Sequence, residues 1–111
     1  MKKILFGLLI VLLSGCTTLK LNQAVADAHD PKVVQAYEKT LNDVIKEVQN
    51  DPSYKRIPLD SKAEVDWFIT QAFLYWDKKI SRDEFVKRGV TKYPGYKESF
   101  EYLADRIKQD K

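Results

Sequence analysis

The sequence contains one cysteine, Cys16, and one histidine, His29, among its 111 residues. A single cysteine cannot form a disulfide within the chain, so the folded part must be stable through packing alone. His29 stands near the carboxylates of Asp27 and Asp30, and one imidazole with two exposed carboxylates is a poor metal site. We therefore expect His29 to be solvated, and we predict neither a metal site nor a cofactor.

The sequence also lacks a hydrophobic run long enough to cross a bilayer, which takes about 20 residues in a helix. The longest apolar run extends from Ile4 to Leu13 and is interrupted only by Gly7. Lys2 and Lys3 precede this run. A cationic start followed by a short apolar run is typical of a secretory signal.

The apolar run ends in Leu13, Ser14, Gly15 and Cys16. These four residues resemble the lipobox of bacterial lipoproteins, in which a branched apolar residue and two small residues precede the modified cysteine. The resemblance implies that residues 1–15 are a signal peptide, cut off between Gly15 and Cys16. It also implies that lipid on the Cys16 sulfur holds the mature protein to a membrane, stably if two or three acyl chains are attached. The alternative is an ordinary secretory signal that contains a cysteine by chance.

Thr17 follows the cysteine and bears on the destination of the protein. In Gram-negative lipoproteins an aspartate at this place retains the protein in the inner membrane. Thr17 is not an aspartate, so this retention signal is lacking. For a Gram-negative source, the resemblance therefore implies an outer-membrane lipoprotein that faces the periplasm.

The mature part has no large excess of either charge. The whole chain has 19 Lys and Arg against 16 Asp and Glu, a formal charge of +3. Losing Lys2 and Lys3 with the signal leaves 17 against 16, a charge of +1. A near-neutral surface of mixed sign provides no electrostatic attraction for nucleic acid, so we exclude nucleic-acid partners.

No segment of strand length alternates between apolar and polar residues, whereas helical periodicity recurs. Residues 16–29 are small or polar and are expected to form a tether, although they could also begin the first helix. Asp30 and Pro31 form a helix start. Apolar residues then recur at three- and four-residue spacing, and residues 50–53 end the helix. These apolar residues are Val34, Tyr37, Leu41, Val44, Ile45 and Val48.

Two S-x-x-E patterns, at Ser61 and at Ser81, predict the starts of two further helices, because a serine hydroxyl can accept the third backbone N–H of a helix. The first of these helices is expected to reach residue 78 or 79. The second is short and is expected to end at Gly89 and residues 93–95. A last helix is expected over about residues 96–109. The sequence thus predicts an all-α domain at residues 30–111, a small bundle of three main helices and one short helix.

The helix that starts at Ser61 is apolar on two sides, because Trp67 and Leu74 lie opposite its main apolar face. Such a helix is either packed between neighbours, the interpretation we favour, or presents a strip to a partner. If it presents a strip, Trp67 and Leu74, with Gln71 and Lys78 beside them, form the predicted partner surface, since Trp often dominates binding energy. Three secondary candidates are expected to be rim aromatics with hydroxyls in water. They are Tyr54, Tyr93 and Tyr102.

No catalytic set is recognisable in the sequence. There is no G-x-S-x-G element, and lipidation would consume the one thiol. Glu47, Asp66 and Asp77 each have basic or polar residues three or four positions away, so we expect surface ion pairs. We predict no catalytic residue and a non-enzymatic protein.

Three functions are compatible with these features. The leading hypothesis is an accessory lipoprotein that binds an envelope protein and positions, chaperones or inhibits it. A second is a lipoprotein of exclusion or immunity, which blocks a phage, plasmid or toxin at the envelope. A third is an envelope enzyme that acts through carboxylates, which requires a pocket with at least two convergent acidic side chains of perturbed pKa.

Overall fold

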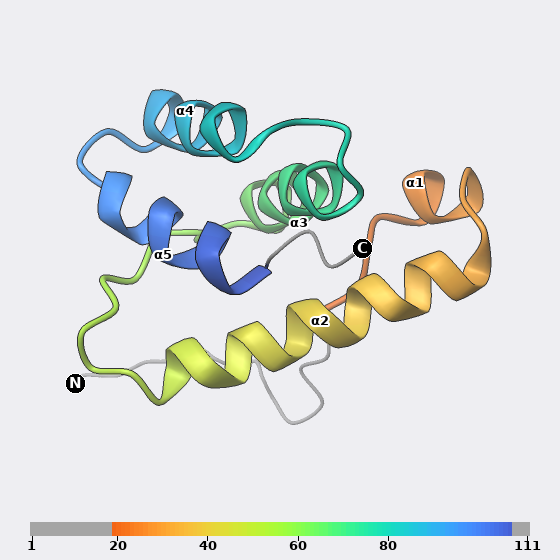
Figure 1. Ribbon diagram of the computed structural model, residues 1–111, viewed down its shortest axis with the longest axis horizontal. Coiled ribbons are helices and arrows are strands. Elements are labelled where there is room, and N and C mark those ends of the chain that lie inside the picture. Colours follow the sequence, from red (N-terminus) through yellow and green to blue (C-terminus); the bar gives the residue numbers. More distant parts are fainter. Residues whose placement is uncertain (1–18, 108–111) are drawn as a thin grey trace.

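The computed structural model describes residues 19–107, which form helices and no strand (Figure 1). The predicted signal peptide, Cys16 and the last four residues lie outside the described residues. The helices are α1 (Gln23–Asp27), α2 (Pro31–Gln49), α3 (Lys62–Trp76), α4 (Arg82–Lys92) and α5 (Lys97–Ile107). The all-helical class is confirmed. The helix expected to be short, α4, has 11 residues, the same length as α5.

The predicted helix starts are present with the expected caps. The Asp30 carboxylate accepts the Lys32 N–H (2.8 Å), and Pro31 occupies the first position of α2. The hydroxyls of Ser61 and Ser81 accept the N–H of the glutamate three residues later, at 3.1 and 3.0 Å. These bonds satisfy backbone N–H groups that have no partner within a helix, which is why local sequence determines these starts.

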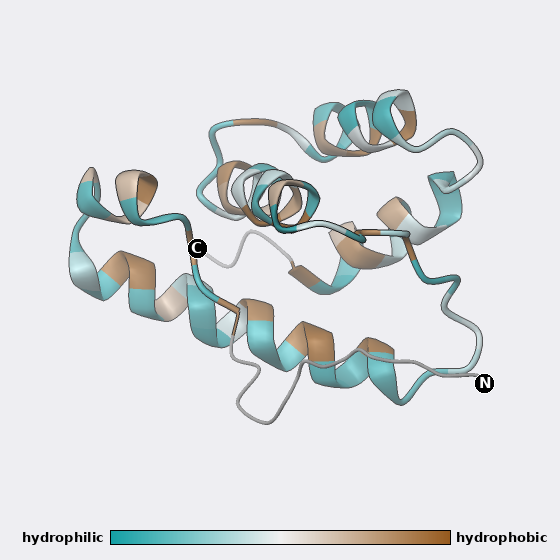
Figure 2. Ribbon diagram, turned by 180° about the vertical axis from the view of Figure 1, so that it is seen from behind, coloured by the Kyte–Doolittle hydropathy of each residue, from teal (hydrophilic) through white to brown (hydrophobic). Residues whose placement is uncertain are grey.

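Helix α3 lies between α2 and α4 (Figure 1). On the α2 side, the Tyr37 hydroxyl donates to the Ile69 carbonyl at 2.6 Å. On the α5 side, the Tyr75 hydroxyl donates to the Ala104 carbonyl at 2.9 Å. In Figure 2 the hydrophobic residues of α2 lie on the side turned toward the other helices. The favoured interpretation of α3 as a helix packed between neighbours therefore agrees with the structure.

Gly89 brings α4 against α5. It is buried inside α4 rather than at the end of the helix, where the sequence placed it. A methyl group on its Cα would lie 2.4 Å from Cδ1 of Phe100, whose ring is fully buried. The expectation that Gly89 ends the helix was wrong. Glycine is needed here because a side chain would collide with the Phe100 ring, and not because the chain turns at this position. Helix α4 ends before Tyr93, at the segment 93–95 that was the other predicted end.

The expected tether needs a correction from Leu19 onward. The Asn42 side chain accepts the Leu19 N–H (3.0 Å) and donates to the Leu19 carbonyl (3.1 Å), while the Glu38 carboxylate accepts the Leu21 N–H (2.9 Å). The Leu21 side chain is 5% exposed. Residues 19–21, which we call the strap, are thus fixed to the flank of α2, and α1 follows them. Residues 19–21 are therefore packed on the helical domain and do not form a free tether.

No helix within residues 19–107 is both long enough and apolar enough to cross a membrane.

Candidate partner-binding groove

The structure divides the strip predicted on α3. Trp67, Gln71 and Leu74 are half-buried, and Lys78 is exposed. Trp67 and Gln71 line a groove of about 430 Å³ between α3 and α4. Leu74 and Lys78 do not line it. Two of the four predicted residues, Trp67 and Gln71, thus share a groove with α4, and the partner surface itself stays a prediction.

Trp67 belongs partly to the core and partly to this groove. Its ring packs on Tyr93, with the ring centroids 5.9 Å apart and the planes at 60°. The Lys92 ammonium lies 5.3 Å from the Trp67 ring centroid, close enough for a cation–π interaction. The indole thus packs on the core residue Tyr93 and contacts the Lys92 ammonium at the groove.

Polar side chains connect the two walls of the groove. Arg88 on α4 donates to the Gln71 side-chain carbonyl (2.8 Å) and to the Glu84 carboxylate (2.7 Å). The hydrogen bond from Arg88 lowers the pKa of Glu84 below its usual value, so this carboxylate is ionised at neutral pH. Arg88 is therefore oriented by two partners, as a binding group on a rigid surface must be.

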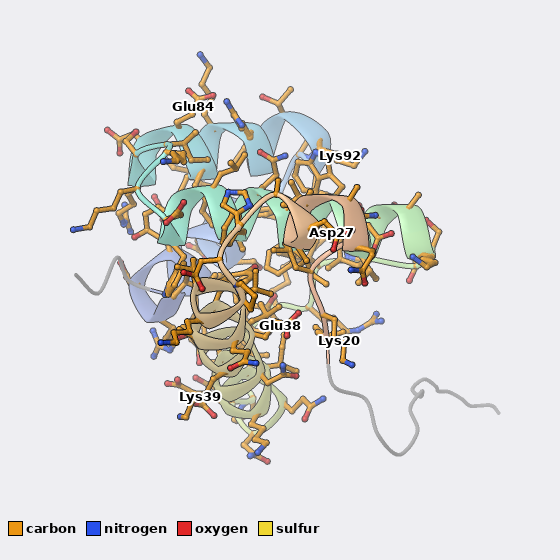
Figure 3. All side chains as sticks on the ribbon, turned by 90° about the vertical axis from the view of Figure 1, so that its right-hand side faces the viewer. Lys20, Asp27, Glu38, Lys39, Glu84 and Lys92 are labelled. Atoms are coloured by element: carbon orange, nitrogen blue, oxygen red, sulfur yellow. The ribbon has the colours of Figure 1, made fainter. Side chains whose placement is uncertain are left out.

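The groove carries more positive than negative charge. Its lining includes the cations Lys87, Arg88 and Lys92 and a single carboxylate, Glu84. Figure 3 shows Glu84 and Lys92 at α4, on the other side of α3 from Glu38 and Lys39 of α2. Lys87 and Lys92 are exposed, so their ammonium groups are available to a ligand. This groove suits an anionic partner with an apolar part that can contact Trp67.

Lys78 lies in the turn that ends α3 and does not line the groove. It adopts φ = 64°, in the left-handed region, directly after the C-cap of α3. The Lys79 N–H donates to the Leu74 carbonyl (2.8 Å), and the Lys78 N–H donates to the Tyr75 carbonyl (3.0 Å). This pair of bonds is a Schellman motif, which usually has glycine where Lys78 stands. Lys78 therefore occupies the left-handed position of this turn, and its role as a partner residue stays a prediction.

The secondary tyrosines are not rim residues with hydroxyls in water. Tyr93 donates to the Glu64 carboxylate (3.0 Å), and Tyr102 donates to Asp51 (2.5 Å). Burial, followed by the hydrogen bond to Glu64, raises the pKa of Tyr93 to about 12. Tyr54 is half-buried, and burial raises its pKa to about 12 as well. The hydroxyls of Tyr93 and Tyr102 thus join parts of the chain that are 29 and 51 residues apart, and the Tyr54 ring packs on the Tyr102 ring with centroids 5.2 Å apart.

His29 is also placed differently from the prediction. It is half-buried, and its ring lies edge-on to Phe73 with centroids 4.8 Å apart. Its Nδ1 lies 2.9 Å from the Val25 carbonyl. The nearby carboxylates had suggested a solvated side chain, but the chain reversal between α1 and α2 turns the ring onto the core. Residues 19–107 contain no group of three or more His, Cys, Asp or Glu side chains placed to hold a metal ion.

The three single acids all form ion pairs, but only Asp66 has its partner at the predicted spacing. Asp66 pairs with Lys62 at 2.8 Å within α3, and Asp77 lies 3.9 Å from Lys79. Glu47 pairs with Arg106 of α5 at 3.0 Å, a partner far along the chain.

A second hollow of about 310 Å³ lies between the strap, α1 and α2, and its acids are Asp27 and Glu38. Both accept hydrogen bonds from the segment that lines it, Asp27 from Gln23 and Glu38 from the strap.

Sequence reasoning missed the α4 wall of the groove. Its residues fall on one helix face at spacings of three and four, a pattern visible in the sequence. They are Glu84, Lys87, Arg88, Thr91 and Lys92. The pattern resembles any solvated helix face, and only the packing of α4 against α3 brings it beside Trp67.

Comparison with known proteins identifies no relative: no protein-family model, no curated protein and no solved structure matches the chain.

Proposed function

We propose that this protein is a lipid-anchored accessory protein of the bacterial envelope, which binds another envelope protein and positions, chaperones or inhibits it. The observation that carries the proposal is the lipobox, Leu13–Cys16, after a cationic start and a short apolar run. In a Gram-negative source, Thr17 favours the outer membrane, with the domain facing the periplasm.

The α3–α4 groove is the proposed partner site. It joins an aromatic surface, Trp67, to three cations and to a polar group, Gln71, that Arg88 orients. Interfaces are enriched in Trp and Arg because both combine a large contact area with a directed polar group. The chemistry that fits is an acidic segment of the partner with an apolar side chain for the indole.

A binding role accounts for the groove better than catalysis does. The single carboxylate of the groove, Glu84, is paired with Arg88 and has a lowered pKa. A general acid at neutral pH requires a raised pKa, and a general base requires a position without such a strong partner. We therefore propose a non-enzymatic role.

Two measurements test the proposal. In growing cells, Cys16→Ala should abolish incorporation of labelled fatty acid and leave the precursor uncut, and unchanged labelling would contradict the anchor. A photo-crosslinking residue at Thr91, an exposed position of the groove, should then capture the partner from the intact envelope.

The crosslink requires a matched pair of charge variants. Lys87→Glu with Lys92→Glu should reduce capture at least tenfold. The control, Lys32→Glu with Lys97→Glu, changes the net charge equally at exposed first-turn positions of α2 and α5, where acidic residues suit the helix dipole. Equal loss of capture in both pairs would show that net charge matters and the groove does not.

A further inference from the structure

The strap fixes where the chain enters the domain. Leu19 is held at both its N–H and its carbonyl by the single side chain of Asn42, and Leu21 is held by Glu38. Both partners lie in the middle of α2, at consecutive turns of the same flank. The attachment point is therefore on the side of the molecule and not at the end of a free arm.

Three peptide steps lead from Cys16 to Leu19. At about 3.6 Å per residue, this segment spans at most about 11 Å even when fully extended. The domain measures 42 × 29 × 23 Å. The segment from Cys16 to Leu19, which we call the leash, is therefore shorter than half of the smallest dimension of the domain. A lipid on Cys16 therefore cannot reach around the domain to any other face.

The lipid end of the leash has a fixed depth. The glycerol carried by a lipidated cysteine lies at the base of the headgroup layer, which is about 5–8 Å thick in each leaflet. Crossing this layer uses about half of the leash or more, which leaves Leu19 within a few ångströms of the membrane surface, on the order of 5 Å.

We propose that the bilayer surface is the partner of the α2 flank: once lipidated, the domain lies on the headgroups with the strap side down and turns the α3–α4 groove away from the membrane. This inference rests on the proposed lipidation of Cys16. Helix α4 lies on the opposite side of α3 from α2 in two perpendicular views (Figures 1 and 3).

The chemistry of the flank fits a headgroup layer. Gln35, Glu38, Asn42 and Lys46 follow one another along it at spacings of three and four, and Lys20 stands exposed on the strap. The one carboxylate in this set, Glu38, is occupied by the Leu21 N–H. Polar amides and ammonium groups meet phosphate headgroups favourably, and Lys near an anionic surface is attracted to it.

The test measures depth at two sites of the lipidated protein in vesicles of phosphatidylethanolamine with phosphatidylglycerol. Lipidation converts the only native thiol into a thioether, so one introduced cysteine takes one fluorophore. Gln35→Cys places the label on the flank, and Lys87→Cys places it on α4; both positions are exposed. A headgroup nitroxide lipid should quench the Gln35→Cys label at least fivefold more than the Lys87→Cys label.

The control lengthens the leash. About 20 Gly/Ser residues inserted between Thr18 and Leu19 have a root-mean-square span of about 25 Å, comparable to the domain, and should bring the two quenching values within a factor of two. Equal quenching with the native leash would overturn the orientation, and a contrast that survives the insertion would overturn the role of the leash. An intact mass without lipid, and a chain that fails to float with vesicles, would instead contradict the proposed anchor.

Discussion

Replacing Gly89 by alanine tests whether the close approach of α4 and α5 holds the bundle together. The added methyl group would lie 2.4–2.5 Å from three atoms of the Phe100 ring. Ordinary contacts between carbon atoms are about 3.5–4.0 Å, so the ring or the helix must move by about 1 Å. The ring has no free space, because it is fully buried and packs on Phe68, Phe85 and Tyr93.

Two opposing effects determine the magnitude. Alanine inside a helix is favoured over glycine by about 1 kcal/mol. Overpacking of a filled core costs typically about 1–3 kcal/mol, and three simultaneous ring contacts place this site at the upper end. We expect Gly89→Ala to lower the free energy of unfolding by about 2 kcal/mol, which corresponds to a fall in Tm of about 10 °C for a domain of this size.

Urea and thermal unfolding followed by circular dichroism measure this change directly. A double-mutant cycle supplies the control: in a Phe100→Leu background, the smaller side chain leaves room, and Gly89→Ala should cost less than half as much. Gly95→Ala is a second control, since no atom lies within 4 Å of the new methyl group and only the backbone angle, φ = 92°, opposes it. If Gly89→Ala stabilises the protein by about 1 kcal/mol, helix propensity dominates and the argument from the Phe100 contact is refuted.

Three other substitutions have defined outcomes. Tyr37→Phe removes the 2.6 Å hydrogen bond to Ile69 without changing the ring, and should lower the unfolding free energy in urea by about 1 kcal/mol; no change would mean that the bond contributes nothing net. Lys78→Gly relieves a left-handed backbone position and should raise Tm by a few degrees, on the order of 3–5 °C; a lower Tm would show that the lysine side chain matters more than its φ. Hydrogen bonds, first from the Ser53 side chain, lower the pKa of Asp51 to about 2, so its contribution is complete above its unfolded pKa of about 3.9 and is lost as the pH falls toward 2. Asp51→Asn should therefore lower the urea midpoint at pH 6 and have a much smaller effect at about pH 2, whereas a difference independent of pH would exclude the carboxylate charge as its cause.

Features governed by neighbouring residues could be predicted from the sequence. The starts of α2, α3 and α4 depend on a cap and the backbone N–H groups two or three positions later, so Asp30, Ser61 and Ser81 identify them. The core face of α2 follows from helical periodicity alone. Its fully buried members, Tyr37 and Leu41, are both in the predicted set.

Features governed by long-range contacts could not be predicted. The strap depends on a side chain 23 residues away, Asn42, which reads in the sequence as one more polar residue on a solvated face. The Tyr102–Asp51 bond joins residues 51 apart, and nothing local distinguishes this tyrosine from one at a rim. For the groove, Trp67 and Gln71 could be found by their place on α3, but the α4 wall required the packing of the two helices.

Because of where its charges lie, the domain should respond to salt differently in folding and in binding: its stability should change little, whereas its affinity for an acidic ligand should fall. The ion pairs of residues 19–107 all lie at the surface, and the most buried polar bonds, such as Tyr37 to Ile69, join uncharged groups. Surface pairs contribute little to stability, so raising the ionic strength from 0.1 to 1 M, where the Debye length falls from about 10 to about 3 Å, should leave the fold nearly unchanged. The same change would screen the cations of the α3–α4 groove from an acidic ligand. A concentrated salt wash should thus release the proposed partner while the helical domain stays folded.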